Sequence, residues 1–226
     1  MVPLSPSIFK AYDIRGIVGK TLDIGVARQI GQAFGTAARI KGEHTVIIGR
    51  DGRLSGPELA AALASGLQRA GVDVIDLGVV ATPMVYFATH ALDAKSGIMV
   101  TGSHNPPDYN GFKMVLAGEA IYGDAIQGLY QTIVRADFAS GNGSYRTHDI
   151  KDAYLPRISS DVQTSRKMKI AVDCGNGVAG AFAPELYRAM GCEVTELFCE
   201  VDGNFPNHHP DPAHPENLQD LIRCLK

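Results

Sequence analysis

The chain has 226 residues, of which 45% are hydrophobic and 20% charged, a balance typical of a globular protein with its own core. Its net charge of −3 argues against a nucleic-acid partner, which would call for a basic face. No apolar run reaches the ~18 residues of a membrane span, and the N-terminus lacks a signal-peptide core, so we expect no membrane partner and a cytoplasmic protein.

The region from residue 45 to residue 100 alternates between predicted strands and helices. Short β-branched and apolar runs predict buried strands, and apolar residues four apart predict a helix with one buried stripe. Ser55 and Glu58 have the spacing of a capping box, and Gly71 is a C-terminal cap. The resulting β-α-β-α-β order predicts a largely parallel sheet with helices on its faces. The predicted elements are a strand at 45–48, a helix from 55 to 71, a strand at 72–77, a helix opening at Thr82-Pro83 and a strand at 97–100.

After residue 100 the chain continues with a strand, a helix and a linker. Residues 111–115 predict a strand paired back on the third one, and residues 124–138 predict a helix. The run 139–144 is small and polar, which favours a domain boundary after it. The strand, loop, helix, glycine, strand order then returns, with a strand at 169–173, a helix at 181–190 and a strand at 192–198. The expected fold class is α/β, with two related α/β/α domains at 1–144 and 145–226 and mixed, largely parallel sheets.

The second half of the chain ends in a proline-rich loop and a helix. Residues 206–215 hold four prolines, and a helix is predicted from Glu216 onward. The chain stops inside that predicted helix, so we expect the second domain to be incomplete at its C-terminal end. The cysteines form no C-x-x-C pair, so buried free thiols are expected rather than a zinc or redox site: Cys174, Cys192, Cys199 and Cys224.

A serine and a histidine follow the third predicted strand, in the stretch TGSHNPPDYNGFK at 101–113. Ligands of parallel α/β sheets bind beyond the carboxyl ends of the strands, so Ser103 is placed where a site would form. The equal alternative is that Ser103 only caps a turn, which Asn105-Pro106 continues. His104 is a poor base for its own neighbour, because adjacent residues in an extended segment point to opposite sides. The G-x-S-x-G pattern is also absent, so a serine hydrolase is disfavoured.

Four stretches of the chain resemble signatures of one family. "TGSHNP" followed by "NGFK" is similar to the phosphoserine loop of the α-D-phosphohexomutase superfamily, with Gly102 where alanine is usual. "KAYDIRG" at 10–16 and "DGNFPNHHPDP" at 202–212 resemble its phosphomannomutase/phosphoglucomutase branch. "GRDGRLSG" at 49–56 matches a further motif of the family. The resemblance covers the whole chain in order.

The resemblance implies a four-domain isomerase that interconverts hexose 1-phosphates and 6-phosphates. A phosphoserine gives its phosphoryl group to the sugar, and the bisphosphorylated intermediate then returns its other phosphate to the serine. The implied substrates are the 1- and 6-phosphates of glucose and mannose, with glucose 1,6-bisphosphate as activator. A Mg²⁺ ion bound by the phosphoserine and three aspartates supplies the charge neutralisation that phosphoryl transfer needs.

Site residues carry over from the matching motifs. Ser103 matches the phosphorylated serine and metal ligand. Lys113 matches a lysine suited to proton transfer or charge stabilisation, and Arg15 an arginine that contacts the transferring group. The alternatives are that both are surface charges and that Tyr12 is a half-buried core aromatic. The implied catalytic residues are Ser103, Lys113, Arg15 and His104, and the implied substrate-binding residues are Tyr12, Arg15 and Asn105.

A zinc site is the competing interpretation of the proline-rich loop. Four side chains there have a spacing that resembles metal ligands: His208, His209, Asp211 and His214. The prolines hold the loop extended, which scatters adjacent side chains. The same segment belongs to the family pattern as an ordinary loop, so the loop interpretation is favoured.

One departure from the family pattern bears on activity. The aspartate-rich metal loop of the family, a D-G-D-G-D-R-type run, is absent from these 226 residues. We therefore expect an N-terminal portion of a longer enzyme, inactive alone and partnered by the missing C-terminal domains. The alternative is a naturally short, non-catalytic module that binds phosphosugars or proteins. A longer reading frame containing the aspartate loop would decide for the enzyme.

Overall fold

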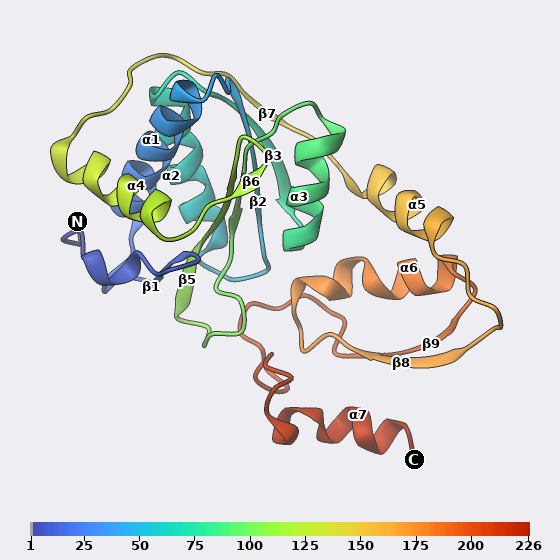
Figure 1. Cartoon of the computed structure of the whole chain (residues 1–226). Coiled ribbons are helices and arrows are strands. Elements are labelled where there is room, and N and C mark those ends of the chain that lie inside the picture. The colour runs from blue at the N-terminus through green and yellow to red at the C-terminus, as the bar shows by residue number, and fades with distance from the viewer. Residues whose placement is uncertain (1) are drawn as a thin grey trace.

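The computed structural model describes residues 2–226, which form one seven-stranded sheet and one two-stranded sheet (Figure 1). In spatial order the strands of the larger sheet are β1 (Ile14–Ile17), β5 (Tyr109–Leu116), β4 (Gly97–Val100), β2 (Thr45–Arg50), β3 (Asp73–Val79) and β7 (Tyr145–Thr147), and β6 (Glu119–Ala120) pairs with β5. The neighbours from β4 to β7 are parallel, as the predicted β-α-β-α-β order requires. β5 runs antiparallel to both β4 and β1, which confirms the predicted return strand.

Helices cover both faces of the larger sheet (Figure 1). One face carries α1 (Ile24–Ile40), α2 (Gly56–Arg69) and α4 (Asp124–Arg135), and the other carries α3 (Thr82–Ala91). Each face has its own cluster of buried apolar side chains, from Phe34 and Leu63 on the α1–α2 side and from Val85 and Met99 on the α3 side. Successive residues of the central strands point alternately into the two clusters, so the sheet is buried on both faces between the helix layers.

The ends of α2 show where local prediction succeeds and where it fails. Ser55 has helical backbone angles and no side-chain capping bond, so the predicted capping box is wrong. Its hydroxyl instead accepts a 2.9 Å hydrogen bond from the side-chain amide of Asn110, which lies 55 positions along the chain. Gly71 follows the helix with a φ of +81°, the left-handed conformation expected of a C-terminal glycine.

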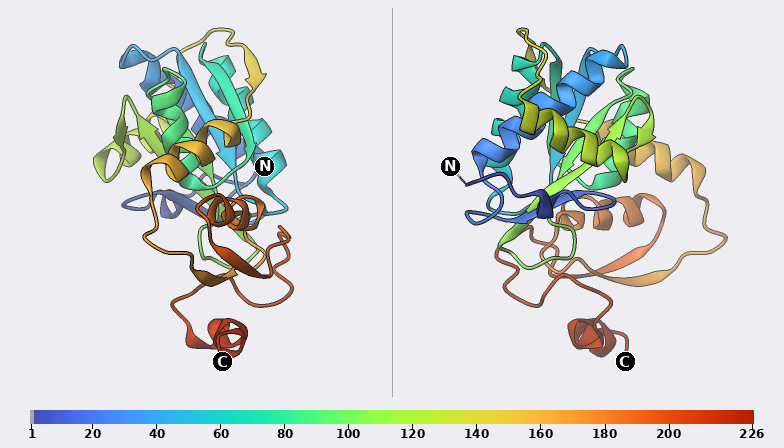
Figure 2. Two further views of the ribbon diagram at one scale, coloured as in Figure 1. Left: turned by 90° about the vertical axis from the view of Figure 1, so that its right-hand side faces the viewer. Right: turned by 60° about the vertical axis from the view of Figure 1, so that its left-hand side comes forward.

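A smaller unit follows the first sheet. Its parallel strands β8 (Lys169–Asp173) and β9 (Glu193–Leu197) confirm the predicted repeat of the strand, helix, strand order. Its helices are α5 (Lys151–Asp161), α6 (Ala183–Ala189) and α7 (Gln219–Cys224), and it has short 3-10 turns at Val178–Ala181 and Pro215–Leu218. A further 3-10 turn, Pro6–Ile8, precedes β1 in the first unit. Both views of Figure 2 place α7 at the end of the molecule remote from the larger sheet.

Several boundaries differ from the sequence-based expectation. β7 begins at Tyr145 and pairs with β3, so the first sheet extends past the expected boundary at 144/145. The two domains at 1–144 and 145–226 stay a prediction. The last helix ends at Cys224 rather than running through Lys226. Within residues 2–226, every helix is too short or too polar to cross a membrane.

The four cysteines are free thiols in different environments. Cys192 is buried as expected, whereas Cys174 and Cys199 are half-buried and Cys224 is exposed. The expectation of four buried thiols is therefore wrong for three of them. Cys224 lies on α7, which buries none of its residues, and this explains its exposure.

Candidate active site

The loops that leave the carboxyl ends of β2 and β4 meet at one edge of the larger sheet. Together with the smaller unit they surround a cleft of about 320 Å³. Ser103, His104 and Lys113 line it from the first unit, and Phe205 and Pro210 line it from the second. Parallel α/β sheets bind ligands at this edge, so the structure places the predicted serine loop where the sheet topology favours a site.

Ser103 has a left-handed backbone conformation, with a φ of +54°. This conformation is uncommon for a residue other than glycine and needs support from its surroundings. The Ser103 amide donates to the hydroxyl of Thr101 at 2.9 Å, and that hydroxyl donates to the Asp51 carboxylate at 2.6 Å. The Gly102 amide also donates to Asp51, at 3.3 Å. The first residues of the loop are therefore fastened to the loop after β2.

A buried cation closely approaches the backbone at Gly102 from beneath the loop. A Cβ atom there would overlap the guanidinium of Arg53. Arg53 is 1% exposed and donates to the main-chain carbonyl of Ser103 at 2.9 Å. The absent methyl group thus lets a buried cation lie directly against the serine loop.

Two of the predicted cations share one buried carboxylate. Asp13 directly precedes β1 and is 5% exposed. Ile14 pairs with Phe112 across the antiparallel ladder, so Asp13 lies beside Lys113, and Arg15 lies on the same strand face as Asp13. Oδ2 of Asp13 is 2.7 Å from Nη2 of Arg15 and 3.9 Å from Nζ of Lys113. The trio carries one net positive charge beside the cleft that Lys113 lines.

The remaining predicted residues differ in placement. His104 lines the cleft, whereas Tyr12 is 78% exposed and does not line it. The alternative of Tyr12 as a half-buried core aromatic is therefore wrong. The side-chain amide of Asn105 donates to the Gly102 carbonyl at 2.8 Å, so it closes the turn that holds the serine.

Sequence reasoning missed three residues of this site: Asp13, Asp51 and Arg53. All three lie inside the quoted stretches "KAYDIRG" and "GRDGRLSG". Alternation along β1 places Asp13 and Arg15 on one face, which was a readable signal. The contacts of Asp51 and Arg53 had no such signal, because they join segments about fifty positions apart.

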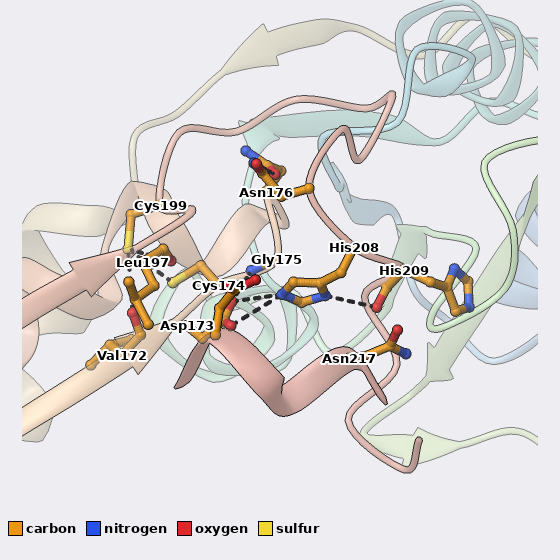
Figure 3. Close-up of polar contacts among 12 residues, drawn as sticks. Val172, Asp173, Cys174, Gly175, Asn176, Leu197, Cys199, His208, His209 and Asn217 are labelled. Atoms are coloured by element: carbon orange, nitrogen blue, oxygen red, sulfur yellow. Dashed lines mark hydrogen bonds and ion pairs between the residues drawn. The ribbon is translucent and has the colours of Figure 1, made fainter. Parts of the chain in front are cut away.

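An aspartate–histidine pair of the smaller unit lines a neighbouring cavity of about 300 Å³, which shares His104 and Cys174 with the cleft (Figure 3). Nε2 of His208 lies 3.0 Å and 3.1 Å from the two carboxylate oxygens of Asp173, and Nδ1 lies 3.0 Å from the carbonyl oxygen of His209. Burial lowers the pKa of His208, but the hydrogen bonds to His209 and Asp173 outweigh it and raise the pKa above its usual value. With acceptors at both ring nitrogens, this geometry favours the imidazolium form.

Two thiols lie beside the same pair. Sγ of Cys199 is 3.4 Å from Sγ of Cys174, which lines the cleft (Figure 3). Burial, followed by the hydrogen bond shared with Cys199, raises the pKa of Cys174 to about 12. Burial also raises the pKa of Cys199. Both groups are therefore protonated and weakly nucleophilic at neutral pH.

The chain was compared with known families and structures. The phosphoglucomutase/phosphomannomutase model of alpha/beta/alpha domain I matches residues 6–140, and that of domain II matches residues 149–226. A phosphomannomutase/phosphoglucomutase of Pseudomonas aeruginosa is 55% identical over 223 residues, which cover 99% of this chain and 48% of that protein. A phosphoglucomutase of Neisseria gonorrhoeae is 54% identical over 228 residues, covering 100% of this chain and 50% of that protein.

A solved structure gives the same result in three dimensions. A phosphoglucomutase/phosphomannomutase family protein from Burkholderia thailandensis superposes with a TM-score of 0.95 at 61% identity. The match covers 99% of this chain and 50% of that one. The chain thus spans about half the length of the curated relatives it matches.

Proposed function

The chain belongs to the phosphoglucomutase/phosphomannomutase family, and from this we propose that it is the N-terminal portion of a phosphohexomutase. The whole enzyme interconverts hexose 1-phosphate and hexose 6-phosphate as an intramolecular phosphotransferase. Its substrates are the phosphates of glucose and mannose, and glucose 1,6-bisphosphate is its activator. The observation that carries this proposal is Ser103, held in a left-handed conformation at the end of β4 and lining a cleft beside Lys113.

The reaction passes one phosphoryl group through Ser103. The phosphorylated serine transfers its phosphoryl group to the free hydroxyl of the hexose monophosphate, which forms a bisphosphorylated sugar and a serine alcohol. The sugar turns over in the cleft, and its other phosphate returns to Ser103. No phosphate is gained or lost, and the product is the isomeric monophosphate.

The cations beside the cleft suit this chemistry. Lys113 exchanges a proton with the attacking hydroxyl or stabilises its charge, and Arg15 binds the transferring phosphoryl group. His104, which lines the cleft, orders the loop and takes part in the transfer. By their match to the family motifs we also assign Tyr12 and Asn105 to the sugar phosphate, which would meet Tyr12 outside the residues that line the cleft. Phosphoryl transfer depends on positioning and charge neutralisation, so a fixed serine next to a net positive cluster is a suitable arrangement.

Magnesium is implied by the family, and residues 2–226 contain only part of what would bind it. No group of three or more His, Cys, Asp or Glu side chains there is arranged to hold a metal ion. Asp51, the carboxylate fastened to the serine loop, is occupied by Thr101, Gly102 and Arg53. Residues 2–226 therefore do not form a complete magnesium site, and the family match proposes Ser103 as one ligand. When bound, the ion would neutralise phosphoryl charge, and we assign its other ligands to the C-terminal domains that the proposal implies.

The test of the proposal is phosphorylation of Ser103 in the longer protein. The chain is expressed together with the C-terminal domains that the proposal implies, and the product is incubated with glucose 1,6-bisphosphate. Peptide mass spectrometry should find phosphate on Ser103, and Ser103→Ala should abolish turnover in a coupled assay. Ser7→Ala, at an exposed serine, should not change it.

Other outcomes separate the alternatives. Phosphate on a different residue, or wild-type turnover by Ser103→Ala, would refute the assignment. Binding of hexose phosphates with no turnover would favour the non-catalytic module. The 226-residue chain alone should fold without catalysing and should bind Mg²⁺ weakly by calorimetry. Robust turnover by that chain would show that it is a complete enzyme. The cytoplasmic location stays a prediction.

A further inference from the structure

Arg53 is a buried guanidinium whose partners belong to the serine loop. It lies in the loop after β2 and is 1% exposed, so each of its donors needs an acceptor within the protein. Its Nη atoms donate to four main-chain carbonyls: Ser103 at 2.9 Å, Asn105 at 2.6 Å, Pro106 at 2.6 Å and Tyr109 at 3.0 Å. One side chain therefore binds three carbonyls of the loop that carries Ser103 and the carbonyl of the first residue of β5.

The loop from Ser103 to Asp108 depends on Arg53 for hydrogen bonds that its own backbone does not make. The segment from Ser103 to Asp108 belongs to no strand or helix, so its carbonyls have no ladder of their own. The carbonyls of Ser103 and Asn105 converge on one Nη atom, which holds the turn that begins at the left-handed Ser103. Asp51 also holds the loop. Its carboxylate lies 3.3 Å from Nε of Arg53 and accepts hydrogen bonds from the Thr101 hydroxyl and the Gly102 amide.

The smaller unit covers the other side of the guanidinium. The Phe205 ring centroid lies 5.3 Å from Cζ of Arg53, a cation–π contact. Gly203 packs against the loop after β2 that carries Arg53, and a Cβ added at Gly203 would lie 2.6 Å from the Gly52 carbonyl oxygen. Asn176 anchors this segment, because its side chain binds the Glu200 carbonyl at 2.9 Å and the Asn207 amide at 2.7 Å. Both units therefore meet at Arg53.

We propose that Arg53 is a positioning residue that holds Ser103 in its transfer conformation, with Phe205 of the smaller unit pressed against it. This inference rests on the function proposed above. Arg53 contacts main-chain carbonyls and lies beneath the loop, so it acts through Ser103 rather than on the sugar. Phe205 covers the guanidinium, so its loss would expose Arg53 to water and weaken the hydrogen bonds that hold Ser103. Through this contact the smaller unit affects the position of the serine.

The first test measures loop order in the 226-residue chain itself. Amide hydrogen exchange is followed by mass spectrometry in peptides covering 102–109, with β2 and β4 as internal references. Because hydrogen bonds to a charged group are lost, Arg53→Met and Arg53→Lys should speed exchange in 102–109 by about tenfold or more, with the references unchanged. Leu54→Ala, at an exposed neighbour, should leave the loop as in wild type.

A second variant covers the case in which Arg53 substitutions unfold the chain. Phe205→Leu keeps every Arg53 hydrogen bond and removes the aromatic face, so exchange in 102–109 should rise about two- to fivefold. Unchanged loop exchange in the Arg53 variants would overturn the proposal. So would an equal rise throughout the first unit, since that would make Arg53 a general stabilising residue.

The kinetic test uses the longer protein proposed above. Arg53→Lys should lower kcat by about a hundredfold, the penalty for misplacing a reacting group, and leave KM for hexose phosphate unchanged. A raised KM with unchanged kcat would place Arg53 in substrate binding and overturn the proposal. Absence of mutase activity in the wild-type longer protein would refute the proposed function, and the exchange measurement would then decide the role of Arg53 in loop order.

Discussion

The carboxylate of Asp13 holds the guanidinium of Arg15 through hydrogen bonds of 2.7 Å and 3.2 Å. The same Oδ2 atom lies 3.9 Å from Nζ of Lys113. Asp13 is buried, whereas the side chains of Arg15 and Lys113 are 37% and 32% exposed. A buried anion thus binds two partly exposed cations, of which Lys113 lines the cleft, and the exposed fractions of both leave them accessible to a phosphoryl group.

Removing either cation should slow the transfer step. In the longer protein, Arg15→Ala and Lys113→Met should each lower kcat by about 10²–10³-fold, the range for losing a contact to developing charge. Lys10→Ala is the matched control, because it removes a nearby exposed cation outside the Asp13 cluster. Steady-state turnover with folded circular dichroism spectra checks this. Activity near wild type in both variants would remove these residues from the site.

The His208–Asp173 pair should make stability depend on pH. The folded-state pKa of His208 is raised above 6.5, so its contribution is complete below that value and is lost as pH rises through the folded pKa. Wild type should therefore be more stable than His208→Gln at about pH 5.5, and this difference in unfolding free energy should shrink toward about pH 9. The size of the decrease is about 1.4 kcal/mol for each unit by which folding raises the pKa. Urea unfolding at both pH values measures it.

His209→Gln is the control for that experiment, since Figure 3 shows its ring away from Asp173. This variant should keep the pH dependence of wild type. A difference between wild type and His208→Gln that grows with pH would contradict the prediction, because it would mean that folding favours the neutral imidazole.

The thiol of Cys174 should resist alkylation although it lines the cleft. Its pKa of about 12 leaves little thiolate at neutral pH. Lower thiolate content, partly offset by higher intrinsic nucleophilicity, should slow its reaction with iodoacetamide about a hundredfold relative to the exposed Cys224. Peptide mass spectrometry over time gives both rates. Equal labelling of the two in folded protein, rather than only in urea, would disprove the prediction.

The contact between α1 and α2 should not tolerate a methyl group at Gly66. A Cβ there would overlap the Arg28 carbonyl and lie 2.9 Å from the Gln32 amide nitrogen. Gly66→Ala should destabilise the chain by about 1–3 kcal/mol in urea unfolding, as overpacking does. Gly128→Ala on α4 is the matched control, because nothing lies within 4 Å of its added Cβ. That change should stabilise by up to about 1 kcal/mol, the helix propensity of alanine over glycine.

Local sequence signals are enough to predict the order of strands and helices from 45 to 100, the return strand and the second strand–helix–strand unit. These elements carry their signals locally, as apolar runs, as helical stripes and as glycine or proline at helix ends. The position of Ser103 beyond a buried strand followed from the same local pattern. α1 has no counterpart among the predicted elements, because its three glycines weaken the helical signal and its burial against α2 compensates.

Which side chains meet depends on how the elements pack in three dimensions. The Ser55 hydroxyl binds Asn110 instead of capping its own helix, and β7 joins the first sheet beyond the expected boundary. Asp13 reaches Lys113 because β1 and β5 pair in one register, and Arg53 reaches Ser103 because β2 and β4 are neighbours. Such contacts depend on strand register and on packing across the whole sheet. A local pattern fixes an element, but it holds no information about the distance between side chains fifty or a hundred positions apart.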